Sequence, residues 1–278
     1  MRCLRQPGPA LAERIESVAG HGVALDFVLE PGLSLNDALT RPLIAARIPS
    51  GTLVFADAVL APFSYVLPGP SPDTAHAAYF SAPYSPGEVR VEIANATVGR
   101  RDGAPFVHCH AAWIEPDGTR RGGHILPHET IVAAGAPVRA WAFADVVIAA
   151  EPDPETNFTL FRPLPTGATG DGTPMVAARI RPNEEIGAAL RVLCARHGFT
   201  GAIVRGGVGS LIGPRFTDGS VVGDHATEVL VRRGSVTTRC DPVLQMLVMD
   251  MEGSVHEGVL QPGDNPVCIT FELVIEAA

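Results

Sequence analysis

The segment Phe106-Val-His-Cys-His-Ala-Ala-Trp-Ile-Glu-Pro-Asp-Gly-Thr-Arg-Arg-Gly-Gly-His-Ile-Leu126 carries the strongest structural signal in the chain. Its two ends are typical of β-strands, and Pro116-Asp117-Gly118 between them fits a three-residue hairpin loop. In such a loop a type I turn is followed by a glycine in the left-handed region. A hairpin with this loop places His110 directly opposite His124.

Three histidines of this hairpin are expected on one face of the sheet. Side chains alternate between the two faces along a strand, so His108 and His110 share a face. Directly opposite residues also share a face, which adds His124. A two-residue Asp-Gly turn would shift the register by one residue and turn His124 away, so the prediction depends on the longer loop. Gly122 and Gly123 leave room for a close backbone approach.

Three neutral imidazoles at one point are typical ligands of zinc or of another divalent transition metal. Three protein ligands leave a coordination position open, which is the arrangement of catalytic zinc sites. An open position lowers the pKa of a bound water or holds a carboxylate or carbonyl oxygen. The spacing is equally compatible with a polar cross-strand cluster that holds no metal. The candidate metal ligands are His108, His110 and His124.

Charged residues beside the histidines are the candidates for substrate binding and for proton transfer. Arg120 and Arg121 flank the cluster in the sequence, and guanidinium groups bind anions in a bidentate manner. We therefore expect these two arginines to bind the substrate. His128, Glu129 and Glu115 are the candidate catalytic general bases.

The composition excludes several classes of protein. The 278 residues are 46% hydrophobic and 18% charged, which is enough apolar material for ordinary cores. All 21 basic residues are arginines, so the lysine that Schiff-base enzymes, Walker A loops and protein kinases need is missing. The net charge of −9, with no long basic run, argues against nucleic acid as a partner.

The sequence predicts a cytoplasmic protein without a membrane segment. No apolar run is long enough for a transmembrane helix, and the first residues lack the apolar segment of a signal peptide. The 5 cysteines include no Cys-x-x-Cys pair, and their odd number favours free thiols in a reducing compartment.

The order of predicted elements repeats along the chain. In the first half, a strand at Val23–Leu29 precedes a helix capped by Ser34. In the second half, a strand at Met175–Ile180 precedes a helix that begins after Asn183 as its N-cap and ends at Gly198. Several further strands, separated by Gly, Pro and Asp turns, follow each helix.

This repeat predicts two tandem domains of the α+β class. The intervening segment is rich in Pro, Gly, Thr and Asp, as linkers are. We assign residues 1–155 to the first domain, 156–173 to the linker and 174–278 to the second domain. Each domain is expected to be a mainly antiparallel sheet with packed helices.

At these residues the sequence resembles the plants-and-prokaryotes-conserved domain, the PCC or PPC family. The first-half match comprises the His-x-His strand, Asp117-Gly118, the Gly-Gly-His sequence and Asp145 in a closing strand. The second-half match runs from Arg181 to Gly213 and ends in Thr270-Phe-Glu-Leu-Val-Ile275. The resemblance implies a compact α+β domain that forms trimers, and some prokaryotic members resemble metal binders at these histidines. Plant members contact DNA through a separate AT-hook, which this sequence lacks.

The second half departs from the family pattern. The strand that corresponds to His-x-His reads Leu244-Gln-Met-Leu-Val248, and the Gly-Gly-His position reads His256-Glu-Gly258. Only one imidazole remains, so we expect no second metal site. The second half is then a partner subunit built into the chain, which supplies an interface or covers the first site. By the symmetry of the family, chains would assemble as a homotrimer or another homo-oligomer.

Three functions are compatible with these features. The first is a metal-dependent enzyme, of the hydrolase or the lyase and isomerase type, that acts on a small anionic metabolite through the open three-histidine site. The second is a non-enzymatic assembly module that binds a metabolite or a metal. The third is a DNA-associated regulator, which the net charge and the missing AT-hook disfavour.

Overall fold

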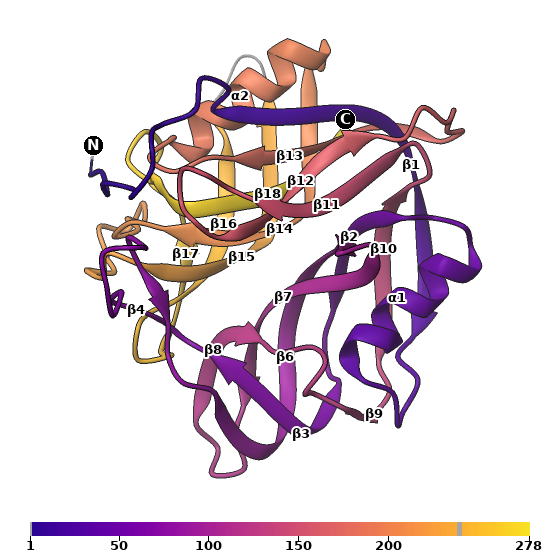
Figure 1. Ribbon diagram of the computed structural model, residues 1–278, viewed down its shortest axis with the longest axis vertical. Coiled ribbons are helices and arrows are strands. Elements are labelled where there is room, and N and C mark those ends of the chain that lie inside the picture. The colour runs from indigo at the N-terminus through magenta and orange to yellow at the C-terminus, as the bar shows by residue number, and fades with distance from the viewer. Residues whose placement is uncertain (1, 238–240) are drawn as a thin grey trace.

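The computed structural model describes residues 2–237 and 241–278 and is mainly antiparallel β-structure with two short helices (Figure 1). The first-half elements are β1 (Ile15–Val28), α1 (Leu35–Ala45), β2 (Ser50–Phe55), β3 (Val59–Val66), β4 (Pro68–Gly69), β5 (Tyr79–Phe80), β6 (Tyr84–Arg101), β7 (Ala104–Ile114), β8 (Arg120–Ile125), β9 (Val132–Ala134) and β10 (Pro137–Phe143). A hairpin of β11 (Val146–Pro152) and β12 (Thr159–Pro165) follows. The second-half elements are β13 (Thr173–Ile180), α2 (Ile186–His197), β14 (Gly201–Leu211), β15 (Thr227–Thr237), β16 (Val243–Met249), β17 (Val255–Val259) and β18 (Val267–Ala277).

The two halves share one strand order. The first half runs β1-β10-β2-β6-β7-β8, and the second half runs β13-β18-β14-β15-β16-β17. Each half has its helix between the first two of its strands along the chain, as the sequence repeat predicts. Strand β1 joins the two halves into one continuous sheet, because Ile15–Gly22 pairs with β13 and Gly22–Val28 pairs with β10. Figure 1 shows most of the first half in the lower part of the molecule and the second half in the upper part, with β1 running across the upper part.

Each half has its own core, in which one helix packs on the sheet. The apolar residues of both helices recur at helical spacing and are buried: Leu35, Leu39 and Leu43 on α1, and Ile186, Leu190 and Leu193 on α2. A smaller apolar cluster joins the halves and contains Ala112, Val208, Leu230, Leu247 and Met249. The second-half sheet therefore buries one face against α2 and turns the other towards β7.

The helix ends confirm two of the three predicted caps. The Ser34 hydroxyl accepts a hydrogen bond from a backbone N–H in the first turn of α1, and Gly198 ends α2 with a φ of 71°. The prediction of Asn183 as the N-cap of α2 is wrong, because the carboxylate of Glu185 takes that role. The Asn183 side chain instead bonds the backbone of Leu4, a competition that local sequence does not reveal.

Part of the segment predicted as a linker is a strand. Strand β12 lies inside 156–173 and pairs with β11 along its whole length. Pro163 and Pro165 are tolerated there because β12 pairs with β11 alone and forms an edge. Asp145, expected within a closing strand, lies in the break between β10 and β11.

Four of the five cysteines and two α-helices lie within the described residues. Cys3, Cys109, Cys194 and Cys268 are free, whereas Cys240 lies outside the described residues. Neither α1 nor α2 is long and apolar enough to cross a membrane, and no other α-helix lies in residues 2–237 and 241–278.

A buried network of charges ties β1 to β13 and to the turn after β11. The carboxylate of Asp153 accepts hydrogen bonds from Arg179 and Arg181, each at 2.7 Å, and Arg181 also donates to Glu16 at 2.8 Å. Burial alone would raise the pKa of Asp153, but the two guanidinium groups outweigh it and lower the pKa to about 2. Asp153 therefore stabilises the junction of the halves as an anion.

We expect Asp153→Asn to lower the free energy of unfolding by about 3 kcal/mol, because it leaves buried guanidinium charge uncompensated. The folded-state pKa lies below the unfolded value, so the contribution is complete above about pH 4 and is lost as the pH falls towards about 2. Urea unfolding at neutral and acidic pH measures both effects. Asp26→Asn is the control, since Asp26 forms an exposed pair with Arg139 and should contribute under about 0.5 kcal/mol. Equal losses in the two variants would contradict the assignment.

Candidate metal centre

The β7–β8 hairpin has the predicted register. His110 pairs directly with His124. Gly118 has a φ of 86°, the left-handed conformation expected at the end of the three-residue loop. The carboxylate of Asp117 accepts a hydrogen bond from the backbone N–H two residues later, which fixes the turn. The loop therefore has the three residues that are needed to place His124 on the same face of the sheet as His108 and His110.

The three imidazoles converge on one point. Nε2 of His110 lies 3.0 Å from Nε2 of His108 and 3.3 Å from Nδ1 of His124. One ring nitrogen of each histidine lies within 4.8 Å of the other two. The hairpin thus brings together the three residues predicted as metal ligands.

Two of the rings are oriented by acceptors on their outer sides. Nδ1 of His110 lies 2.9 Å from the carbonyl oxygen of Val229, and Nδ1 of His108 lies 3.0 Å from Oε2 of Glu272. A carbonyl oxygen only accepts, so Nδ1 of His110 carries a proton and its Nε2 presents a lone pair to the cluster. An outer acceptor combined with an inner lone pair is the usual arrangement of metal-ligating histidines.

The inner nitrogens of His108 and His110, 3.0 Å apart, need either a cation or a proton between them. If His108 donates its Nδ1 proton to Glu272 and is otherwise neutral, its inner lone pair faces that of His110 and the two repel. A bound cation removes the repulsion, and so does a second proton on His108. Burial alone would lower the pKa of His108, but Glu272 and Glu228 outweigh it and raise the pKa. The surroundings are therefore built to stabilise a cation.

Two buried acidic side chains from the second half lie against the cluster: Glu272 is the acceptor of His108, and Glu228 has a pKa high enough to keep it mostly protonated at pH 7. Glu272 lies on β18 and Glu228 on β15, and Oε2 of Glu228 lies 3.1 Å from Nε2 of His110. Burial raises the pKa of Glu228 to about 8, against the opposing effect of His108. Burial and the neighbouring histidines lower the pKa values of His110 and His124 well below their ordinary value. Both rings are thus neutral and available as ligands at pH 7.

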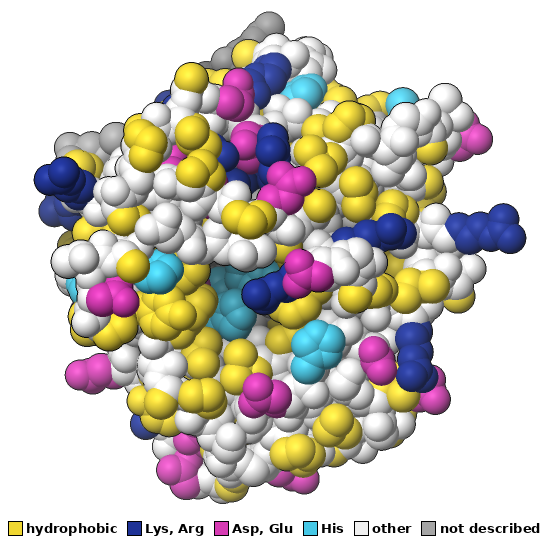
Figure 2. All heavy atoms as spheres, in the orientation of Figure 1, with side chains coloured by type: hydrophobic (Ala, Val, Ile, Leu, Met, Phe, Trp, Pro, Cys, Tyr) yellow, Lys and Arg dark blue, Asp and Glu magenta, His cyan; other side chains and the backbone are white. Residues whose placement is uncertain are grey.

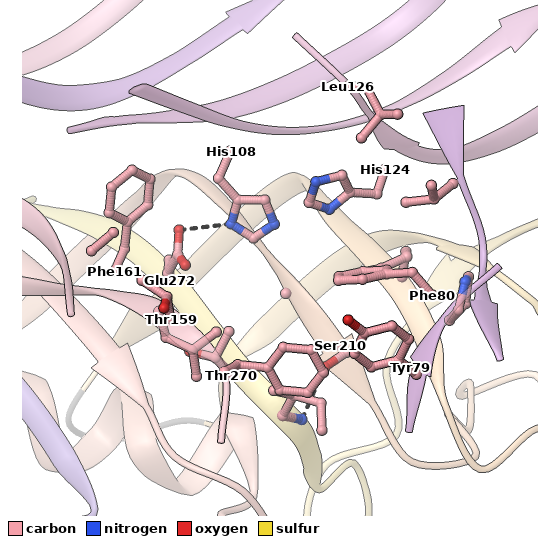
Figure 3. Close-up of a pocket in the computed structure, with 18 of the residues that line it drawn as sticks. Tyr79, Phe80, His108, His124, Leu126, Thr159, Phe161, Ser210, Thr270 and Glu272 are labelled. Atoms are coloured by element: carbon pink, nitrogen blue, oxygen red, sulfur yellow. Dashed lines mark hydrogen bonds and ion pairs between the residues drawn. The ribbon is translucent and has the colours of Figure 1, made fainter. Parts of the chain in front are cut away.

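The cluster opens into a pocket of about 390 Å³. His108 and His124 line it from the first half, and Glu228 and Glu272 line it from the second half. Figure 2 shows imidazole surface at the base of a hollow that hydrophobic side chains surround. Figure 3 shows the pair of His108 and Glu272, with the aromatic rings of the pocket around it. A small molecule can therefore reach the open side of the histidine cluster.

Of the other predicted site residues, two lie in this pocket. His128 and Glu129 belong to its lining, and the ring of His128 lies against that of Phe106 with centroids 5.7 Å apart. Both are thus in a position to contact a ligand, as the expected general bases must be.

The other predicted site residues, Arg120, Arg121 and Glu115, pair with one another or with Glu92 and do not line this pocket. Arg120 donates two hydrogen bonds of 2.7 Å to Glu92, and Arg121 pairs with Glu115 at 3.6 Å. None of the three belongs to the pocket lining. They lie at the loop end of the hairpin, and the four residue steps from Arg120 to His124 span about 13 Å of strand.

The two carboxylates were not predicted, although the sequence contains a signal for them. Glu228 and Glu272 are each the single charged residue in an apolar stretch of strand, Thr227–Val231 and Val267–Ile275. Such a charge is rarely buried unless it is paired. The signal marks a buried carboxylate, but the partner lies more than one hundred residues away and is visible only in the fold.

Comparison with known proteins finds similar solved structures over about half of the chain. No family model and no curated protein matches the chain. A plant- and prokaryote-conserved (PPC) protein from Pyrococcus horikoshii is similar with a TM-score of 0.42 and 17% identity, over 53% of this chain and 96% of that one. A metal-containing protein from Archaeoglobus fulgidus is similar with a TM-score of 0.41 and 16% identity, over 51% and 94%. These matches cover about half of this chain and nearly the whole of each matched chain.

We expect Glu272→Gln to weaken the binding of Zn²⁺ or Co²⁺ by about 10- to 100-fold, because the amide no longer increases the basicity of the His108 ring. Titration against a competing chelator measures the affinity. Glu276→Gln is the matched control, since Glu276 lies on the same strand and pairs with Arg205 away from the cluster. An unchanged affinity in Glu272→Gln would show that the hydrogen bond has no role in metal binding.

Proposed function

We propose that this chain binds a divalent transition metal, such as zinc, through His108, His110 and His124. The close approach of the inner nitrogens of His108 and His110, with both outer nitrogens on acceptors, carries the proposal. Nitrogen ligands of this kind suit zinc and its neighbours rather than magnesium or calcium. Three ligands on one side leave the opposite side free towards the pocket.

We further propose that the protein is a metal-dependent enzyme for a small molecule, of the hydrolase or the lyase and isomerase type. A bound metal would act as a Lewis acid towards an oxygen atom of the substrate or of water. Glu228 is the carboxylate best placed to hold or release a proton there, since its Oε2 lies 3.1 Å from Nε2 of His110. His128 and Glu129 on the pocket wall are further candidate proton carriers.

We infer that the chain is a tandem of two PPC-like domains whose second copy has lost its own histidine site. The repeated strand order supports this, because β16 and β17 take the positions that β7 and β8 take in the first half. Those strands carry Leu244-Gln-Met-Leu-Val248 and His256 in place of the three histidines. In this interpretation the second copy completes the first site through Glu228 and Glu272. We keep a homotrimer of such chains as a proposal from the symmetry of the family.

Elemental analysis of protein purified without added metal tests the metal site. We expect about one transition-metal ion per chain, and its loss in His124→Ala, because two imidazoles hold such an ion far less tightly than three. His124 is only half-buried, so this variant should still fold. His128→Ala is the control, since His128 lines the pocket outside the cluster and should leave the metal content unchanged. Metal retained by folded His124→Ala would refute the ligand set.

Turnover tests the enzymatic part of the proposal. Zinc-loaded and chelated protein are compared on esters, lactones and 2-oxo acids, and activity should require the metal. Glu228→Gln should lower kcat by about 100-fold if the carboxyl group transfers a proton. Glu257→Gln should not, because Glu257 is exposed and pairs with the exposed Arg232. Equal rates with and without metal would contradict the proposal. Ligand-dependent stabilisation without turnover would instead favour the binding module.

A further inference from the structure

One face of the second-half sheet presents a row of four polar side chains to the pocket. Ser210 on β14 pairs directly opposite Glu228 on β15, so the two share a face. Thr270 and Glu272 lie two residues apart on β18 and also share a face. All four are buried and line the pocket. The residues that follow Ser210, Glu228 and Thr270 in the sequence point to the opposite face of the sheet and belong to the second-half core: Leu211, Val229 and Phe271.

Thr270 is the member of this row without a partner. Thr270 is 4% exposed, yet its Oγ1 has no hydrogen-bond partner in the described part of the chain. Its neighbours are engaged: Glu272 bonds His108, and Oγ of Ser210 accepts a hydrogen bond from a backbone N–H. An unpaired buried hydroxyl destabilises a fold, and valine would fill the same space. Figure 3 shows Thr270 among the residues that surround the pocket, which suggests a ligand as its partner.

The charges of the lining limit the charge of that ligand. Arg101 is the only arginine that lines the pocket among the described residues, and its guanidinium lies 5.4 Å from the ring centroid of Phe106. Glu129, Glu228 and Glu272 also line the pocket. A ligand with several negative charges would lie close to the acidic side chains of Glu129 and Glu272 with Arg101 as its one guanidinium partner in the described lining, whereas a single carboxylate can be balanced by one bound cation or by Arg101.

The remaining wall is apolar and largely aromatic. The ring centroid of Phe80 lies 5.3 Å from that of His124, directly beside the cluster. The other aromatic lining residues are Tyr79, Phe106, Phe158 and Phe161. A volume of about 390 Å³ lies at the lower end of the range for sites that hold small organic ligands. These walls favour a compact ligand with an apolar body of its own.

We propose that the pocket binds a small monocarboxylic acid with an aromatic or branched apolar body. Its oxygen-bearing head lies at the histidine cluster and accepts a hydrogen bond from the hydroxyl of Thr270, and its body lies against Phe80 and the other rings. The position of the oxygen-bearing head rests on the proposed function, because the metal proposed at the histidines would bind it. The assignment narrows the substrate class from small anions in general to monoanionic acids with a hydrophobic body.

Calorimetric titration of the zinc-loaded protein with mandelate, lactate and inorganic phosphate tests the assignment. Mandelate and lactate share a 2-hydroxy acid head, so their difference reports on the phenyl ring. We expect mandelate to bind at least 10-fold more tightly than lactate, and phosphate to bind no more tightly than lactate. Phe80→Ala should abolish the preference for mandelate. Tyr84→Ala should keep it, because Tyr84 is exposed and outside the pocket.

Thr270→Val separates ligand binding from folding. We expect its melting temperature and zinc content to equal or exceed those of the wild type, and its affinity for mandelate to fall at least 10-fold. A lower melting temperature with unchanged mandelate binding would show that the hydroxyl serves the fold and would overturn the assignment. Phosphate binding more tightly than mandelate would also overturn it. If zinc binds but neither acid does, this inference fails and the metal centre stands; if zinc does not bind, the proposed function itself fails.

Discussion

The pairing of β7 with β8 is the constraint on which the site depends, because it decides which face each side chain occupies. Ile125, next to His124, is fully buried in the first-half core together with Cys109 and Trp113. A slip of one residue would exchange the places of His124 and Ile125, burying an imidazole among apolar side chains and exposing an isoleucine in the pocket. The packing of the core therefore fixes the geometry of the histidines.

The close contact of the two halves is the second constraint. Gly122 lies beside the cluster, and a Cβ atom there would approach Cγ of Met249 to 2.4 Å. The absence of a side chain at this position lets the second-half sheet approach the hairpin. That sheet has its core on one side and its polar row on the other, so Glu228 and Glu272 reach the histidines without disturbing either core. The acidic side chains that would balance the positive charge of a bound metal therefore belong to the same chain as the histidines.

Local rules explain what could be predicted from the sequence. The hairpin loop, the helix cap at Ser34 and the helix end at Gly198 each depend on a few consecutive residues, and each was predicted. The choice between Asn183 and Glu185 as a cap depended on Leu4, which is distant in the sequence. The sequence predicts a linker where strand β12 lies, because proline is typical of linkers and is also tolerated in an edge strand.

Proximity in the sequence was a poor guide to the rest of the site. Arg120 and Arg121 follow the loop closely, but the length of the strand and nearby carboxylates hold them away from the cluster. The groups that do surround the histidines come from strands β15 and β18, whose placement follows from the tertiary arrangement of the halves. Only the unusual chemistry of these residues, a lone acid in an apolar strand, could have drawn attention to them.

X-ray absorption spectroscopy of the zinc-loaded protein tests the central claim most directly, because it reports the ligand atoms of the metal itself. The account predicts three imidazole nitrogens at roughly 2.0–2.1 Å together with at least one oxygen ligand, the mark of an open three-histidine site. A shell of sulfur atoms, or fewer than three imidazoles around the metal, would contradict it.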